Sequence, residues 1–228
     1  MVNIFLEGYR FDAPWLHGTL KSYVKPHYRV AVIALSFRDS RVRNADDWDA
    51  LYGKDGGSVY GGICSAFSAY GIGEESITCI NYFTDTKESA AEKIRNADVL
   101  FFTGGLPDRM LERMNTLGIT DVIRRHEKVA MGYSAGALIQ LSEYHISPDH
   151  DYPEFAYYDG LSYIDGFYLE VHYEGRAEQN ESIARVVAER ERPVYATSLM
   201  KGAIIVDNGR IITVGDVRLF NQKEKGEV

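Results

Sequence analysis

The sequence predicts an α/β protein with a mainly parallel β-sheet and a β-hairpin at its C-terminal edge. Apolar runs of strand length alternate with helical patterns from residue 1 to about residue 141, which is typical of parallel strands joined by right-handed crossovers. Tyr28 to Ser36 is almost continuously apolar, as expected for a strand covered by helices on both faces. Near the C-terminus, Asp207-Asn208-Gly209 joins two apolar runs through an Asn-Gly turn signal, which predicts the hairpin.

The predicted strands are short runs rich in apolar and β-branched residues. In chain order they are residues 2–7, 28–36, 76–80, 97–102, 128–131, 167–171, 193–197, 203–206 and 210–214. The predicted helices carry apolar residues at helical spacing or a polar surface pattern. They are residues 12–24, a short helix around Trp48 and Leu51, then 63–70, 86–96, a helix beginning at Pro107, 119–126, a helix after Ser134, and 178–190.

The chain of 228 residues reads as one domain over residues 1–221, followed by a solvated tail over residues 222–228. No linker, repeat or low-complexity segment divides it. Residues 142–173 are rich in tyrosine and contain two turn signals, Ser147-Pro148-Asp149 and Asp159-Gly160. Those tyrosines are expected either to line a substrate pocket or to form a homodimer contact, because exposed aromatic residues favour interfaces.

The composition narrows the classes of partner. Apolar residues make up 45% and charged residues 25%, as in ordinary soluble domains. The formal charge of -8 argues against nucleic acid or an anionic membrane as a partner, since both require a basic surface. The sequence shows no cationic leader with an apolar core and no apolar run of about 18 residues, so we expect a cytoplasmic protein. The known metal-site spacings are absent, and we expect no metal and no cofactor.

The motif that points to chemistry is Gly132-Tyr133-Ser134-Ala135-Gly136, between a strand and a helix. In such a Gly-x-Ser-x-Gly turn the glycines relieve backbone crowding, and the serine is exposed above the sheet next to the free amides of the helix. Ser134 is therefore a candidate nucleophile. The structural alternative is a glycine turn in which Ser134 caps the helix.

A serine nucleophile needs a base, which is usually an imidazole oriented by a third group. His172 follows the predicted strand 167–171, and the C-terminal ends of strands are where open α/β sheets bind ligands. Four acidic residues are candidates for orienting it: Asp149, Asp151, Glu154 and Glu174.

The glycine pair Gly104-Gly105 ends a neighbouring strand and is expected to supply oxyanion donors together with the amide of Ala135. The structural alternative for the pair is a simple strand-to-helix turn.

Three segments in this order and spacing resemble the serine peptidases typified by dipeptidase E and cyanophycinase: Thr103-Gly104-Gly105, Gly132 to Ala137, and Val171-His172-Tyr173. The resemblance implies a class I glutamine amidotransferase-like fold, a flavodoxin-like three-layer α/β/α sandwich. It implies Ser134 as the nucleophile and His172 as the catalytic histidine. The acid of that family lies shortly after the serine, which favours Asp149, with Asp151 next.

Two positions depart from that family. Its glycine motif often reads Gly-Gly-Gly-Asn, whereas Leu106-Pro107 occupy the last two places here. Its aspartyl dipeptidases hold an acidic substrate side chain with a cation, for which Arg176 is the candidate. A surface arginine is the alternative for Arg176.

The sequence thus predicts a serine hydrolase that acts on a small peptide or amide. Two alternatives remain open: an α/β-hydrolase-type esterase with the same pentapeptide, and a non-catalytic small-molecule binding protein on the same fold.

Overall fold

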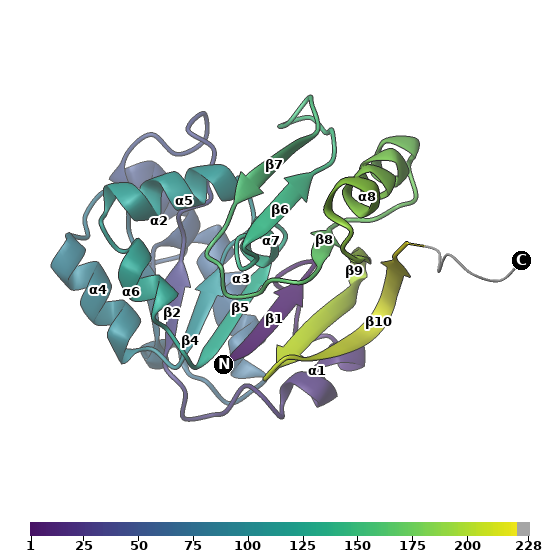
Figure 1. Ribbon diagram of the computed structural model, residues 1–228. Helices are drawn as coiled ribbons and strands as arrows, with labels where there is room; N and C mark the ends of the chain where they lie inside the picture. Colours follow the sequence, from purple (N-terminus) through teal and green to yellow (C-terminus); the bar gives the residue numbers. More distant parts are fainter. Residues whose placement is uncertain (223–228) are drawn as a thin grey trace, which may run out of the picture.

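The computed structural model describes residues 1–222 (Figure 1). Most of the predicted tail, residues 223–228, lies outside this range. The central feature is an eight-stranded sheet with the order β10-β9-β1-β5-β4-β2-β3, to which β8 adds by pairing with β9. Its strands are β1 (Val2–Leu6), β2 (Val30–Ile33), β3 (Ile77–Ile80), β4 (Val99–Phe102), β5 (Val129–Tyr133), β8 (Tyr168–Glu170), β9 (Val194–Asp207) and β10 (Arg210–Phe220).

Strands β1 to β5 are mutually parallel, as the alternation of strands and helices predicts. The predicted hairpin is β9 and β10, and its turn residues Asn208 and Gly209 both have positive φ, the conformation that favours Asn-Gly. Two expected strands, 193–197 and 203–206, are one continuous strand β9. Strand β10 also runs six residues beyond its expected end at Val214.

Helices cover both faces of the sheet and make three layers. The helices are α1 (Pro14–Leu20), α2 (Ala45–Tyr52), α3 (Ser58–Ser68), α4 (Lys87–Asn96), α5 (Pro107–Thr116), α6 (Thr120–Arg124), α7 (Ala135–Leu138) and α8 (Ala177–Arg190), with a 3-10 turn at Glu74–Ser76. Helices α1 to α3 share one hydrophobic core, and α4 to α7 share a second on the opposite face. Strand β1 contributes side chains to both cores, because Ile4 and Leu6 pack in the first core and Phe5 packs in the second.

The tyrosine-rich segment forms a small second sheet, which the sequence did not predict. Strands β6 (Glu143–Ile146) and β7 (Ala156–Asp159) pair in an antiparallel hairpin. The predicted turn signals lie at the ends of these two strands: Ser147 follows β6, and Asp159-Gly160 begins at the last residue of β7. In Figure 1 this hairpin lies over the upper end of the main sheet, next to α8.

Several loops therefore gather at one edge of the sheet. Strands β1, β5, β4 and β2 are parallel, so the residues that follow their C-terminal ends emerge at the same edge of the sheet. In the same order, these residues are Glu7, Ser134, Thr103 and Ser36. Strand β8 reaches this edge differently. It pairs in parallel with the start of β9, and β9 runs antiparallel to β1, so β8 runs against the parallel strands rather than with them.

Candidate active site

Ser134 occupies a strained turn between β5 and α7, as the Gly-x-Ser-x-Gly pattern predicts. Its backbone has φ 53° and ψ -117°, a conformation that residues other than glycine rarely adopt. A Cβ at Gly132 would lie 2.2 Å from the carbonyl oxygen of Gly136, and one at Gly136 would lie 2.1 Å from that of Phe102. Both glycines are thus sterically required. Strain of about 1–3 kcal/mol at such a residue is typical of functional sites.

The base candidate lies against the nucleophile candidate. The Nε2 atom of His172 is 2.8 Å from Oγ of Ser134. His172 also has positive φ, 54°, and its side chain is 38% exposed, so the imidazole is held at the surface of the cleft. The structure brings together the two residues that the sequence paired, at a distance suited to proton transfer.

The carboxylate next to His172 is Glu7, which the sequence analysis did not consider. Its Oε2 lies 2.7 Å from Nδ1 of the imidazole, although the ring N–H does not point along this line. The same oxygen accepts a hydrogen bond of 2.9 Å from the backbone amide of His172, and Oε1 accepts one from the hydroxyl of Thr197. The Glu7 side chain is only 2% exposed. Glu7 therefore contacts both the ring and the backbone of the histidine.

The expectation that Asp149 orients the imidazole is not met by the geometry. Oδ1 of Asp149 instead accepts the amides of Asp151 and Tyr152 and closes a local turn after β6. Asp151 forms an ion pair with Arg38. Asp149 and Asp151 line the cleft, but their carboxylates contact these other partners. Glu7 is the carboxylate that contacts Nδ1 of His172.

The remaining acid alternatives also have other surroundings. Glu174 lies 3.6 Å from Arg176 in an exposed pair, and Glu154 is exposed on the turn before β7. Glu174, two residues after His172, would share a face with it only on an extended strand, whereas His172 has a left-handed conformation that turns the chain away from a strand.

The pKa of His172 results from opposing effects. Burial lowers it, but the contact with Glu7 and the charge of that carboxylate raise it more, and Glu170 and Glu174 add to the rise. The net pKa lies above the usual value of 6.5. A carboxylate that stabilises the imidazolium suits a base that accepts a proton during the reaction.

The glycine pair after β4 lies beside the nucleophile. A Cβ at Gly104 would be 3.3 Å from Cβ of Ser134, and Gly105 has φ +141°, which requires glycine. The amides of Gly105 and Ala135 donate to no backbone acceptor among the hydrogen bonds found in residues 1–222. Both amides belong to residues close to Ser134, so Gly105 and Ala135 stay the candidates for the oxyanion donors.

These residues share a cleft with a volume of about 560 Å³. Its lining combines the candidate catalytic groups with cationic, acidic and aromatic side chains: Glu7, Gly8, Tyr9, Arg10, Arg38, Gly104, Gly105, Tyr133, Ser134, Asp149, Asp151, Tyr152, His172 and Met200. Arg176, the predicted substrate cation, lies outside this set. It lines a smaller neighbouring cavity of about 80 Å³ that shares His172 and Asp149 with the cleft.

Gln179 is a further residue at the site that the sequence analysis missed. It lies buried in the first turn of α8, and its side-chain amide donates to the carbonyl of His172. Its oxygen accepts the amides of Glu174 and Arg176. The side chain thus holds the loop that carries the histidine, and no local sequence signal marks that role.

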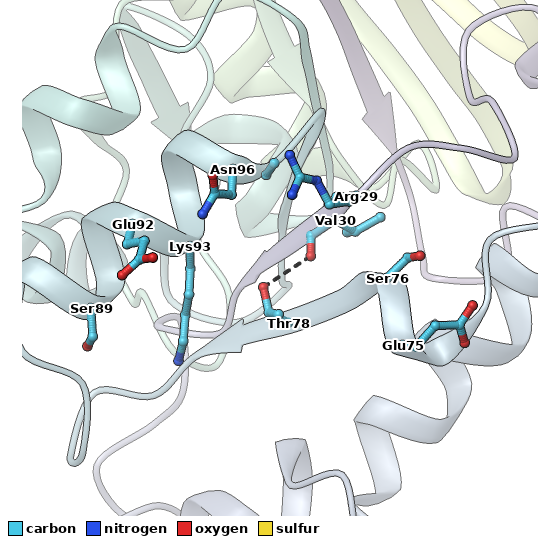
Figure 2. Close-up of a pocket in the computed structure, with 10 residues that line it drawn as sticks. Arg29, Val30, Glu75, Ser76, Thr78, Ser89, Glu92, Lys93 and Asn96 are labelled. Carbon is cyan, nitrogen blue, oxygen red and sulfur yellow. Dashed lines mark hydrogen bonds between the residues drawn. The ribbon is translucent and has the colours of Figure 1, made fainter.

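Figure 2 shows a different cavity, of about 320 Å³, beside the edge strand β3 and helix α4. The hydroxyl of Thr78 donates to the carbonyl of Val30 there, and Lys93 lies along its wall. This cavity shares no lining residue with the cleft at Ser134.

None of the helices in the described part of the chain is long and apolar enough to cross a membrane. Residues 1–222 also contain no group of three or more His, Cys, Asp or Glu side chains arranged to hold a metal ion.

Two solved structures resemble the chain over nearly its whole length. One, from Listeria monocytogenes EGD-e, is a protein whose description assigns it provisionally to peptidase E. It has a TM-score of 0.64 and 19% identity and covers 94% of this chain and 98% of its own. The other is a peptidase from an acI-B1 Actinobacterium, with a TM-score of 0.63 and 12% identity. The match covers 98% of this chain and 95% of that one. At these identities they establish the fold.

No curated protein matches the chain in sequence. The model of peptidase family S51 matches residues 63–214, which include both Ser134 and His172 and span more than half of the chain. The three-layer fold inferred from the resemblance is therefore confirmed, and the chain belongs to peptidase family S51, a family of serine peptidases.

Proposed function

We propose that this peptidase cleaves a small peptide or amide with a triad of Ser134, His172 and Glu7. The observation that carries the proposal is the continuous contact from Oγ of Ser134 to Nε2 of His172, 2.8 Å, and from Nδ1 to Glu7, 2.7 Å. This is the arrangement of nucleophile, base and orienting carboxylate in serine hydrolases, recognised by geometry rather than by chain order.

In the proposed reaction, Ser134 attacks the scissile carbonyl while His172 accepts the hydroxyl proton. The amides of Gly105 and Ala135 stabilise the oxyanion of the tetrahedral intermediate. His172 then donates its proton to the leaving amine, which produces an acyl-enzyme. Water, deprotonated by the same imidazole, hydrolyses that ester and restores the serine. Glu7 keeps the imidazole in the tautomer with a proton on Nδ1 and stabilises its charged form.

The size of the cleft supports a small substrate. A volume of about 560 Å³ is within the range of small-molecule sites, roughly 300–1,000 Å³. The cleft contains two arginines, Arg10 and Arg38, each already paired with an aspartate. A dipeptide library that varies the first residue between acidic, neutral and basic side chains would identify the preference, including any for an acidic residue.

The direct test of the nucleophile is labelling with a fluorophosphonate probe. We expect the wild-type protein to be labelled at one site and Ser134→Ala not to be labelled. Ser182→Ala is the control, because Ser182 is a buried serine that bonds only within α8, to the carbonyl of Glu178. An unlabelled wild type, or equal labelling of Ser134→Ala, would refute the proposal.

The esterase alternative is separated from the peptidase by comparing p-nitrophenyl esters with dipeptides. A protein that hydrolyses esters well and no dipeptide would favour the esterase alternative.

The binding-protein alternative needs an unactivated serine, and the 2.8 Å contact between Ser134 and His172 counts against it. The homodimer, the cytoplasmic location and the lack of a nucleic-acid partner stay predictions from the sequence.

A further inference from the structure

The loop that presents the Gly105 amide is attached to Ser36, a fully buried residue just beyond the end of β2. The hydroxyl of Ser36 donates to the carbonyl of Gly104 at 2.6 Å. The carbonyl of the same serine accepts the amide of Leu106 at 2.7 Å. One residue thus contacts the backbone immediately before and immediately after Gly105.

The direction of these hydrogen bonds follows from the donors available. A carbonyl can only accept, so the single proton of the Ser36 hydroxyl is used on Gly104. The hydroxyl of Thr103 lies 2.7 Å from Oγ of Ser36 and donates to the carbonyl of Ile33 at 3.2 Å. The shorter contact of Ser36, 2.6 Å from its Oγ to the Gly104 carbonyl, therefore sets the direction of the Ser36 proton.

The Gly104 carbonyl controls where the Gly105 amide points. In a trans peptide the C=O and the N–H of the next residue lie in the same plane and point in opposite directions. With the oxygen of Gly104 held on Ser36, the N–H of Gly105 points away from Ser36. Gly104 borders Ser134, and both glycines line the cleft.

Such a peptide needs an anchor because it joins two glycines. Glycine has little steric preference between positive and negative φ, so a peptide between two of them can rotate at low cost. The rotated form would put a carbonyl oxygen where an oxyanion must bind. The carbonyl of Ser36 also lies 2.2 Å from the place of a Cβ on Gly105, so this position cannot carry a side chain that would restrict the rotation.

We propose that Ser36 is a positioning residue that holds the Gly105 amide toward the oxyanion. The inference rests on the proposed serine mechanism and adds the residue that orients one of its two donors. Loss of an oxyanion donor typically lowers the rate by about 100- to 1,000-fold. Since the donor in Ser36→Ala is misdirected for only part of the time, we expect a loss of about 10- to 100-fold.

The test compares Ser36→Ala and Ser36→Cys with wild type and with Ser182→Ala, using the second-order rate of fluorophosphonate labelling and dipeptide hydrolysis across pH. Cysteine nearly keeps the volume of serine but is a weak donor, so its rate should fall between those of wild type and Ser36→Ala. We expect kcat to fall while KM and the pH midpoint set by His172 stay unchanged. A crystal structure of Ser36→Ala should show the Gly104–Gly105 peptide rotated or in two orientations.

Each outcome decides a separate point. If wild type is labelled and both Ser36 variants react at its rate, Ser36 does not position the amide, and the proposed function stands. If the pH midpoint and KM move as well, or Ser182→Ala loses as much, the effect is general destabilisation and the inference is overturned. If Ser36→Ala does not fold, Ser36→Cys decides by the same criteria. An unlabelled wild type refutes the proposed function and this inference with it.

Discussion

Replacing Glu7 by Gln is the most informative change at the site. The substitution keeps the size and shape of the side chain but removes its charge and replaces one acceptor oxygen by an NH2 group. The remaining oxygen can still accept from the backbone amide of His172, but the NH2 group cannot accept from Thr197, and a neutral side chain does not stabilise the charged imidazole. We therefore expect Glu7→Gln to fold and to lose most of its activity.

The magnitude follows from the charge that forms on His172 during the reaction. Opposite unit charges about 4 Å apart attract by about 4 kcal/mol at an effective dielectric constant of about 20. The His172 side chain is 38% exposed. Screening by solvent reduces the attraction, and we take about 3 kcal/mol, which corresponds to a loss of roughly 100-fold in kcat.

The assay is fluorophosphonate labelling and dipeptide hydrolysis from pH 5 to pH 9. The neutral imidazole is the base, so the rate of wild type should rise with pH through the His172 pKa, at a midpoint above 6.5. Glu7→Gln removes a cause of the raised pKa, so its midpoint should move to lower pH while its maximum rate falls. Asp149→Asn should lose less than about tenfold. A full loss in Asp149→Asn with an active Glu7→Gln would refute the geometric argument.

Three further predictions concern Gly105 and Gln179 at the site and Gly61 in α3. Gly105→Ala should lose about 1–3 kcal/mol of stability in a thermal melt, because its φ is +141° and its Cβ would meet Ser36. Gly61→Ala, in α3 with open space around it, should instead gain about 0.5–1 kcal/mol; a loss there would show that glycine replacement in general is harmful. Gln179→Leu should lower kcat by about tenfold, since it frees the carbonyl of His172, and an unchanged kcat would exclude a positioning role.

The sequence was most informative where a pattern is local. The Gly-x-Ser-x-Gly elbow, the Asn-Gly hairpin and the buried parallel strands each follow from steric or hydrophobic rules that act within a few residues. The pairing of Ser134 with His172 could also be predicted, since both follow strand-like runs, although β8 proved to run against the parallel strands.

The contact of Glu7 with His172, on which the proposed triad rests, could not be predicted because it depends on strand order. Glu7 follows β1 directly, and a carboxylate after an apolar strand was visible in the sequence. What could not be read was that β1 lies between β5 and β9, which puts Glu7 beside the loop of His172. Asp149 is closer in sequence to the histidine, but the β6–β7 hairpin directs its turn to other amides. The roles of Ser36 and Gln179 depend equally on contacts between distant segments.

The central position of β1 has a consequence for how the protein becomes active during synthesis. Glu7 is made first, yet its partner His172 lies 165 residues further along the chain and Thr197 lies 190 residues away. Ribosomes add about 5–20 residues per second, so the first strand waits roughly ten seconds or more for these partners. A nascent chain that has just reached Ser134 therefore contains Glu7 but not yet His172 or Thr197. On the proposed mechanism, the order of the strands delays proteolytic competence until most of the chain has been made.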